Sequence, residues 1–243
     1  MNCNALEVLR GEVVACTRCP RLVEYRERVA REKRRAYREW EYWGKPVPPF
    51  GEADAKLFVL GLAPAAHGGN RTGRMFTGDR SGDFLYRALY TTGFASQPQS
   101  VSRDDGMRLI GAYISATARC APPDNKPLPE ELRNCRPYLE RELDLLKDVR
   151  VVLALGRIAF DAYLTILRDR GVIKSRTAYP FGHGVEHRIA PGQPVLLASY
   201  HPSQQNTSTG KLTDTMLTAV FRRARTIIGQ AKTAGPPKPR KKI

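Results

Sequence analysis

The sequence contains no long apolar segment. No run of apolar residues approaches the ~20 that a membrane-spanning helix requires, and residues 1–10 hold no apolar block of the signal-peptide type. These absences exclude a helical membrane protein and predict a soluble, cytoplasmic protein that makes no membrane contact. Hydrophobic residues nevertheless make up 42% of the 243 residues, which is enough to bury the core of one sizeable domain.

Acidic residues are few in comparison with basic ones. The chain has 24 Asp and Glu against 40 Lys and Arg, which gives a formal net charge of +16. Five of the basic residues lie in the tail 231–243, a Pro-rich segment without an acid that is expected to be disordered. Most of the excess therefore belongs to the body of the chain and predicts a polyanionic partner such as a nucleic acid. A basic surface that serves only solubility, or a ribosome-associated protein, is the alternative.

Cysteine is limited to five residues, an odd number, and without a secretory signal structural disulfides are not expected. Cys16 and Cys19 form a Cys-x-x-Cys pair, Cys120 and Cys135 are separated by fourteen residues, and Cys3 stands apart. Four thiolates in two pairs suit a tetrahedral zinc ion or a four-iron cluster, because soft ligands on short segments can bind one soft centre. The spacing does not separate these two, and ordinary buried thiols at Cys120 and Cys135 are the third possibility.

Apolar runs of the buried-strand type alternate with helical patterns along the chain. The runs predict strands over residues 56–60, 112–118, 151–155 and 195–199. Helices are expected over residues 6–15, 21–40, 83–92, 129–146, 156–167 and 212–228, and residues 179–189 have the pattern of a hairpin. Strands joined by helices in this order predict the α/β class, with a single domain over residues 1–230 that holds a four-stranded parallel sheet flanked by helices on both faces.

Three loops rich in polar residues follow predicted strands, at residues 61–82, 119–127 and 200–211. Function in parallel sheets gathers beyond the carboxyl ends of the strands, so these loops are expected to form one site. The first loop holds six glycines, which let a backbone approach a ligand closely. It matches neither the phosphate-loop nor the dinucleotide pattern, so nucleotide hydrolysis is not supported. A long structural loop is the alternative, and a lone histidine such as His201 is often only structural.

Four motifs occur in an order that resembles the uracil-DNA glycosylase superfamily. They are Gly61-Leu-Ala-Pro-Ala-Ala-His-Gly68, Met75-Phe-Thr-Gly-Asp79, Cys120-Ala-Pro-Pro-Asp-Asn-Lys-Pro127 and Tyr200-His-Pro-Ser-Gln-Gln-Asn-Thr207. The resemblance is closest to family five, the iron–sulfur (UdgB) type, and extends over roughly residues 16–228. It implies a monomeric DNA-repair glycosylase that flips uracil and other deaminated bases, such as hypoxanthine, out of double-stranded DNA. Hydrolysis of the N-glycosidic bond would then leave an abasic site.

The resemblance also implies three sets of residues. The ligands of a [4Fe–4S] cluster would be Cys16, Cys19, Cys120 and Cys135, which favours the cluster over zinc. The base-binding residues would be Ala63, Ala65, His67, Phe76 and Asn125. The DNA-binding residues would be Arg71, Ser203, Gln204, Gln205 and Lys211.

Four residues acquire individual roles from the resemblance. Phe76 matches the aromatic residue that stacks on the extruded base, and Asn125 matches the polar residue that reads the edge of that base. His201 matches the histidine that supports the departing base. Asp79 is the carboxylate nearest the motif and is the candidate for positioning water. His201, Asp79 and Asn125 are therefore the expected catalytic residues.

The first motif departs from the better-known relatives, because family four has Gly-Glu-Ala-Pro-Gly where residues 62–65 of this chain carry no acid. The group that activates water is therefore open. The Lys-Arg-Arg-Ile-His insertion of the covalently trapping relative is absent, so no covalent DNA adduct is expected. Two other kinds of protein fit the composition: a non-catalytic nucleic-acid-binding protein with structural zinc, and an iron–sulfur enzyme acting on free nucleosides.

Overall fold

The computed structural model describes residues 2–233. The helices are α1 (Asn2–Val14), α2 (Pro20–Glu32), α3 (Gly69–Thr72), α4 (Arg80–Thr91), α5 (Pro129–Leu145), α6 (Arg157–Asp169), α7 (Gln204–Ser208) and α8 (Asp214–Thr233), with 3₁₀ turns η1 (Arg35–Tyr37) and η2 (Pro123–Asn125). The strands are β1 (Phe50–Gly51), β2 (Leu57–Gly61), β3 (Ala112–Ala116), β4 (Val151–Leu155), β5 (Glu186–His187) and β6 (Val195–Ser199). Of the expected tail 231–243, residues 234–243 lie outside the described residues, and α8 is still helical before them.

The strands form one sheet in the order β1-β3-β2-β4-β6-β5. The four central strands are parallel and correspond to the four that the apolar runs predict. The expected count of four is wrong, because two-residue strands pair antiparallel at the edges, β1 with β3 and β5 with β6. Pairing this short leaves no periodicity in the sequence. The predicted hairpin over residues 179–189 is also wrong, since β5 pairs with β6 instead of within that segment.

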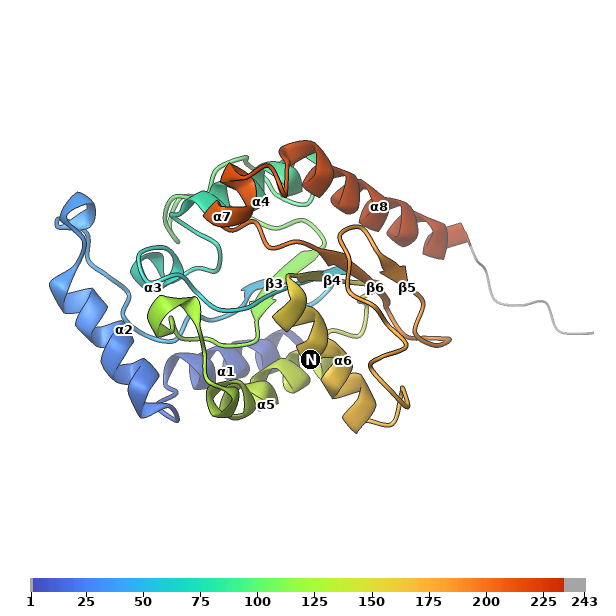
Figure 1. The fold of residues 1–243 in the computed structure, drawn as a ribbon, viewed down its shortest axis with the longest axis horizontal. Coiled ribbons are helices and arrows are strands. Elements are labelled where there is room, and N and C mark those ends of the chain that lie inside the picture. Colours follow the sequence, from blue (N-terminus) through green and yellow to red (C-terminus); the bar gives the residue numbers. More distant parts are fainter. Residues whose placement is uncertain (1, 234–243) are drawn as a thin grey trace, which may run out of the picture.

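Each central strand is buried on both faces, which explains its continuous apolar sequence. Leu57 and Val59 of β2 pack into the core that α4 and α8 cover. Phe58 and Leu60 pack into the core that α1, α5 and α6 cover. Figure 1 shows the sheet lying between these two layers of helices. The α/β class and the placement of helices on both faces are thus confirmed.

Two segments differ from the helices that the sequence predicts. The helix expected over residues 21–40 ends at Glu32, because Lys33 adopts the unusual backbone angles φ 54° and ψ 164°, and only η1 follows. The polar loop expected over residues 200–211 contains α7, which Ser203 caps by accepting a hydrogen bond from the Asn206 backbone N–H. Within the described residues, none of the helices is both long and apolar enough to cross a bilayer.

Candidate active site

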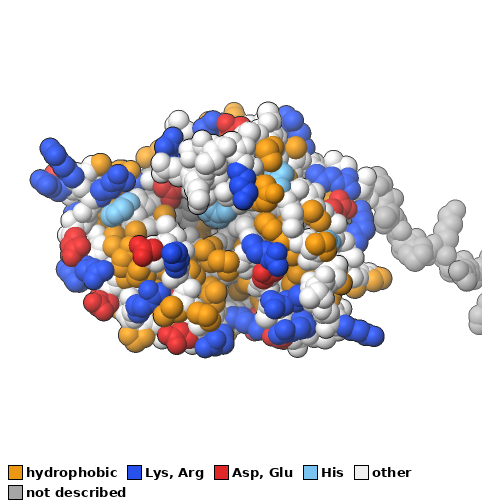
Figure 2. All heavy atoms as spheres, viewed as in Figure 1, with side chains coloured by type: hydrophobic (Ala, Val, Ile, Leu, Met, Phe, Trp, Pro, Cys, Tyr) orange, Lys and Arg blue, Asp and Glu red, His pale blue; other side chains and the backbone are white. Residues whose placement is uncertain are grey.

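A cleft of about 930 Å³ lies at the carboxyl ends of the parallel strands. Its walls come from the loops after β2, β3 and β6, the start of α4, and the segment from α2 to η1. The lining residues include Tyr25, Arg34, Tyr37, Ala63, Ala65, His67, Phe76, Asp79, Asn125, His201, Ser203 and Gln204. The three loops that follow strands therefore meet, as expected. Figure 2 shows Lys and Arg side chains spread over one face of the molecule, a distribution that suits a polyanionic ligand.

Phe76 lies against His201 in this cleft, with their ring centroids 5.9 Å apart and their planes tilted by 34°. Phe76 has a left-handed backbone with φ 52°, which is uncommon for an aromatic residue. Two glycines make room for it. A Cβ at Gly61 would lie 2.7 Å from Cζ of Phe76, and a Cβ at Gly82 would lie 1.9 Å from its carbonyl oxygen. These two glycines, at the two ends of the loop 61–82, thus make room for one half-buried aromatic residue.

His201 follows β6 and is fixed through its backbone. The side-chain amide of Asn206 donates to the His201 carbonyl oxygen at 2.9 Å, and a Cβ at Gly156 would lie 3.3 Å from Cβ of His201. Burial lowers the pKa of His201 to about 4. The imidazole is therefore neutral at pH 7 and is available there as a hydrogen-bonding group without a charge.

Asp79 caps the N-terminus of α4, where its Oδ1 accepts a hydrogen bond from the backbone N–H of Gly82 at 2.8 Å. Burial raises the pKa of this carboxyl group. Asp79 nevertheless lines the cleft. Asp79 thus stabilises the start of α4, in addition to the water-positioning role that is expected from the motif.

Arg71 does not occupy the surface position expected of a phosphate contact, because it is only 3% exposed. Its guanidinium lies 3.9 Å from the ring centre of Tyr37 and 4.2 Å from that of Trp40. Its Nε donates to the His67 carbonyl at 2.8 Å, and its Nη2 donates to the Gly78 carbonyl at 2.6 Å. Arg71 therefore joins two segments of the glycine-rich loop, at His67 and at Gly78, and the DNA contact expected from sequence does not fit this buried position.

The remaining expected residues divide between the cleft and its surroundings. Asn125 is exposed within the cleft, on a tight turn where Asp124 and Asn125 both have positive φ. Ser203 and Gln204 also line the cleft. Gln205 and Lys211 are exposed outside it, and Nζ of Lys211 lies 5.0 Å from the ring centre of Tyr200. Their positions leave them free for a ligand larger than the cleft.

The cleft wall formed by α2 and η1 is not predicted by the sequence reasoning. Tyr25, Arg34 and Tyr37 line this wall. They belong to a highly charged stretch, and most such stretches are solvated helix faces. The signal that could have found the wall is the presence of aromatic side chains among the arginines.

Comparison with known proteins identifies the family. Residues 48–225 match the family described as the uracil DNA glycosylase superfamily. The chain belongs to this superfamily. The Type-5 uracil-DNA glycosylase of Thermus thermophilus is 52% identical over 217 residues, which are 89% of this chain and 95% of that protein. The Type-5 enzyme of Pyrobaculum aerophilum is 49% identical over 214 residues, 88% of this chain and 89% of that protein.

Comparison with a more distant relative supports the likeness to the Type-5 rather than the Type-4 enzymes. The Type-4 uracil-DNA glycosylase of Pyrobaculum aerophilum is 31% identical over 164 residues, 67% of this chain and 74% of that protein. The identity is thus markedly lower than to the Type-5 enzymes. The likeness to family five drawn from the four motifs is borne out.

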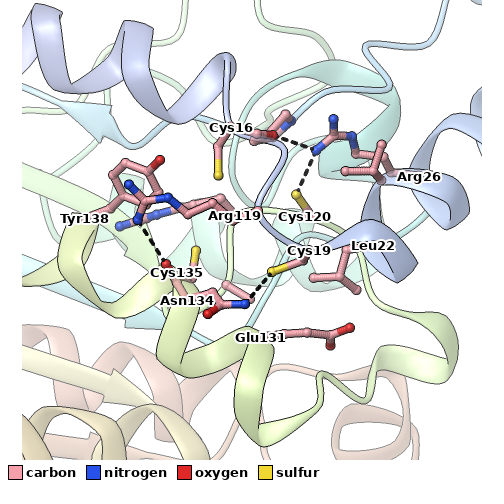
Figure 3. Close-up of a pocket in the computed structure, with 14 residues that line it drawn as sticks. Cys16, Cys19, Leu22, Arg26, Arg119, Cys120, Glu131, Asn134, Cys135 and Tyr138 are labelled. Atoms are coloured by element: carbon pink, nitrogen blue, oxygen red, sulfur yellow. Dashed lines mark hydrogen bonds between the residues drawn. The ribbon is translucent and has the colours of Figure 1, made fainter.

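The four cysteines predicted as ligands line one pocket of this superfamily member. Cys16 and Cys19 come from the turn between α1 and α2, Cys120 follows β3, and Cys135 belongs to α5. Figure 3 shows their sulfur atoms directed toward a common space. All four are free thiols, and burial raises the pKa of Cys135 to about 12. Among the residues described, no three His, Cys, Asp or Glu side chains form a group that could hold a metal ion.

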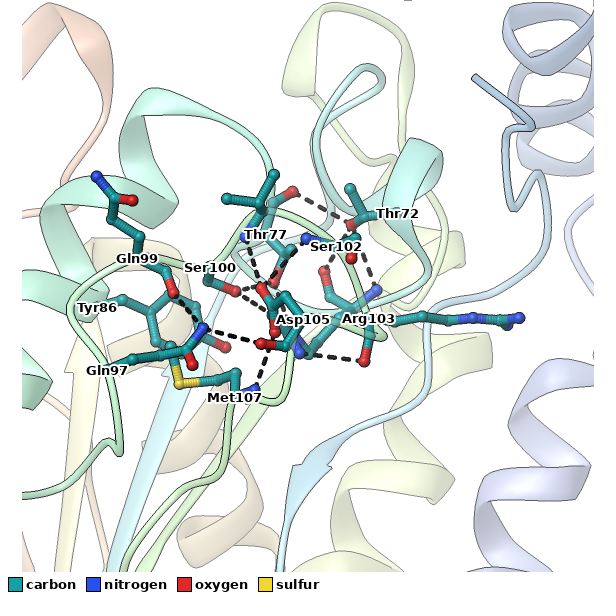
Figure 4. A network of polar contacts seen from close by, with 12 residues as sticks. Thr72, Thr77, Tyr86, Gln97, Gln99, Ser100, Ser102, Arg103, Asp105 and Met107 are labelled. Atoms are coloured by element: carbon teal, nitrogen blue, oxygen red, sulfur yellow. Dashed lines mark hydrogen bonds and ion pairs between the residues drawn. The ribbon is translucent and has the colours of Figure 1, made fainter. Parts of the chain in front are cut away.

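A buried polar network supports the glycosylase cleft from behind Phe76. The Arg74 guanidinium donates to both carboxylate oxygens of Asp105, at 2.8 and 2.7 Å, and to Oγ of Ser100 at 2.6 Å. Thr77 joins through its hydroxyl, 2.7 Å from that of Ser100 (Figure 4). Since Thr77 follows Phe76 directly, the network fixes the backbone that carries the aromatic ring.

Proposed function

We propose that this chain is a monofunctional glycosylase that removes uracil, and other deaminated bases such as hypoxanthine, from double-stranded DNA. The observation that carries the proposal is the pairing of Phe76 with His201 at 5.9 Å inside the cleft. It offers a stacking surface beside a neutral hydrogen-bonding group, which is what an extruded base requires. The names of relatives about 50% identical, uracil-DNA glycosylases, support the same activity.

The reaction begins with extrusion of the base, at a cost of a few kcal/mol that is smaller for a mispair. The base stacks on Phe76 while Asn125 reads its edge. As the N-glycosidic bond breaks, its electron pair leaves with the base, and the sugar becomes oxocarbenium-like. His201 is neutral at pH 7 because burial lowers its pKa to about 4, and it stabilises the developing anion as a hydrogen-bond donor.

Water completes the reaction. Its oxygen forms a bond to the sugar carbon that the base has left, and its released proton balances the charge of the departing base. Asp79 and Asp124 both line the cleft, and Asp79, the carboxylate nearest the Phe76 motif, is the one that we assign to orienting this water. Because one of its oxygens already caps α4, we assign it a positioning role and assign most of the rate enhancement to His201 and the fixed cleft.

We also propose that Cys16, Cys19, Cys120 and Cys135 hold a [4Fe–4S] cluster. Four thiolates suit a zinc ion or a four-iron cluster, and the resemblance to the iron–sulfur type of the family favours the cluster. A four-iron cluster binds each thiolate to a different iron, so it suits four thiols spread around one pocket. When bound, the cluster would cross-link the α1–α2 turn, the loop after β3, and α5, and its role would be structural rather than catalytic.

The donor set fits this group in two further ways. Nη1 of Arg26 donates to Sγ of Cys120 at 3.1 Å, and Nδ2 of Asn134 approaches Sγ of Cys19 at 3.6 Å. Hydrogen bonds to ligand sulfurs are common around iron–sulfur clusters, where they spread the thiolate charge.

The net charge of +16 supports DNA as the partner. We propose that residues 1–230 act as one domain, as a monomer in the cytoplasm. Oligonucleotide duplexes with uracil or hypoxanthine opposite a normal base test the activity. The expected result is strand cleavage after treatment with alkali and none before it, since a monofunctional glycosylase leaves the backbone intact. Uracil-containing DNA that survives alkali, or release of uracil from free deoxyuridine alone, would contradict the proposal.

A further inference from the structure

His67 forms part of the cleft wall, and Tyr42 lies behind it. The Tyr42 hydroxyl oxygen is 3.0 Å from Nδ1 of His67, and the two rings meet edge to face at 6.0 Å. Tyr42 is buried, whereas His67 lines the cleft. Nε2 of His67 forms no hydrogen bond with the residues that the structure describes. It is therefore the ring nitrogen that a bound ligand can reach.

The hydrogen bonds around Tyr42 favour one of the two neutral tautomers of His67. The backbone N–H of Arg34 donates to the Tyr42 hydroxyl oxygen at 3.4 Å. A buried hydroxyl hydrogen needs an acceptor of its own, and Nδ1 of His67 is the acceptor within reach. This arrangement favours donation from the Tyr42 hydroxyl to Nδ1 of His67, which would leave the single ring proton on Nε2.

The imidazole is also held neutral and in place. Burial and the nearby cations Arg34 and Arg71 lower the pKa of His67. Its backbone carbonyl accepts a hydrogen bond from Nε of Arg71 at 2.8 Å, and that guanidinium is clamped between two aromatic rings. The hydrogen bonds that connect Arg34, Tyr42 and His67 thus present a fixed, uncharged donor, Nε2–H of His67, to the cleft.

We propose that Nε2–H of His67 recognises the keto oxygen that distinguishes a deaminated base from its parent, and that Tyr42 positions it. The amino groups of cytosine and adenine are donors, and deamination replaces each with an oxygen that accepts. A fixed donor bonds to this oxygen, whereas an amino group would leave two donors facing each other unpaired. Uracil and hypoxanthine share the keto oxygen, so one donor serves both. The inference rests on the proposed glycosylase function and concerns selection of the base rather than bond cleavage.

Nuclear magnetic resonance of the full-length protein with ¹⁵N-labelled histidine tests the tautomer directly. The His67 signal is assigned by its disappearance in His67→Gln. At pH 7 it should report a proton on Nε2 and none on Nδ1. In Tyr42→Phe the preference for this tautomer should be lost. A proton on Nδ1 of the wild-type ring would overturn the inference, whatever the activity.

Single-turnover excision from a uracil–guanine duplex tests the role. Removing a preorganised donor in His67→Ala should slow excision by about 10²-fold. His67→Gln returns an N–H donor at similar reach and should recover most of the rate. Tyr42→Phe should be about 10-fold slower than wild type, because the donor is present but no longer fixed. Tyr90→Phe, on the exposed surface of α4, is the matched control and should be unaffected.

Binding to an abasic product duplex separates a base contact from a phosphate contact. If His67 reads the base, His67→Ala should bind the abasic duplex as tightly as the wild type does. Equal weakening on uracil and abasic DNA would mean that Nε2–H contacts a phosphate, and the inference would be wrong. A wild-type protein that leaves uracil in DNA would refute the proposed function itself. An active wild type with an equally active His67→Ala variant would refute only this inference.

Discussion

Gly68 leaves the space that the carboxylate of Asp79 occupies, since a Cβ at residue 68 would lie 1.9 Å from Oδ2 of Asp79. The other oxygen, Oδ1, accepts from the backbone N–H of Gly82 at 2.8 Å. The carboxylate is thus enclosed between the loop after β2 and the start of α4. Its place in the cleft depends on a missing side chain on one side and a helix cap on the other.

We predict that Gly68→Ala lowers single-turnover excision of uracil by about 10²-fold, because displacement of a site residue by about 1 Å has an effect of this size. Gly11→Ala in α1 is the control, since a Cβ there meets nothing within 4 Å. It should leave the rate unchanged and raise the free energy of unfolding by about 0.5–1 kcal/mol. A wild-type rate in Gly68→Ala would show that the carboxylate does not need its present position.

Phe76→Ala should weaken excision of every base, because stacking contributes about 1–3 kcal/mol per base and does not depend on base identity. Asn125→Asp should instead change which base is favoured, since it replaces an amide that can donate and accept with a carboxylate that only accepts. Rates on uracil and hypoxanthine duplexes measure both effects. Unchanged rates and preferences in the two variants would remove both residues from the base pocket.

The central sheet and the cleft could be predicted because their signals are local. Strands that are buried on both faces have continuous apolar sequences, as in residues 151–155. The parallel topology then brings the loops that follow these strands to one edge of the sheet. The motif residues Phe76, Asn125 and His201 meet there for this reason. Two-residue edge strands such as β5 carry no such signal, because their pairing depends on a neighbouring strand already in place.

Arg71 shows why side-chain roles are harder to predict than strand positions. In sequence it is a basic residue in a polar loop, which suits a DNA contact. In the structure its guanidinium lies between Tyr37 and Trp40, more than thirty residues earlier in the chain. The contact depends on η1 folding back over the loop, and no periodicity in the sequence predicts that return. The same return places Tyr42 behind His67.

The proposed cluster at the four cysteines leads to a prediction of the iron content of the protein. Purified protein should be brown and contain about four irons per chain if the four thiolates bind one cluster. Cys16→Ser should lose iron and stability together, because the cluster joins three segments. Cys3→Ser, outside the two pairs, should retain full iron content. Colourless protein with one zinc per chain would refute the cluster assignment. Elemental analysis and visible absorption make the measurement.

The exposed arginines in and just after η1, Arg35 and Arg38, are expected to make a salt-dependent contact with DNA beside the cleft. Arg35 and Arg38 are exposed and adjoin the cleft residues Arg34 and Tyr37. If each binds one phosphate, the double substitution to Ala should reduce the slope of log K against log salt by about 0.9 per contact. Lys174→Ala is the control, because this exposed residue lies beyond the C-terminus of α6, near the amino ends of the strands. An unchanged slope in the double variant would place DNA elsewhere.

The relative contributions of His201 and Asp79 to the rate of excision distinguish two ways of breaking the glycosidic bond. His201→Ala should lower the single-turnover rate on a uracil–guanine duplex by about 10²–10³-fold, since it removes a preorganised donor to the departing anion. Asp79→Asn is the informative partner, because Asn still caps α4 and only the charge is lost. Its rate should fall less than that of His201→Ala.

Binding measured at fixed salt completes this test. The His201→Ala variant should still bind uracil-containing DNA, because Ser203 and Lys211 remain available to phosphates. The rate loss would then belong to the chemical step. An inactive Asp79→Asn beside an active His201→Ala would mean that the carboxylate activates water as a general base. Because burial raises the pKa of Asp79, the activity of such an enzyme would fall as the pH drops through that raised value. In our mechanism His201 stays a hydrogen-bond donor through that range, and its ring becomes protonated only as the pH approaches about 4.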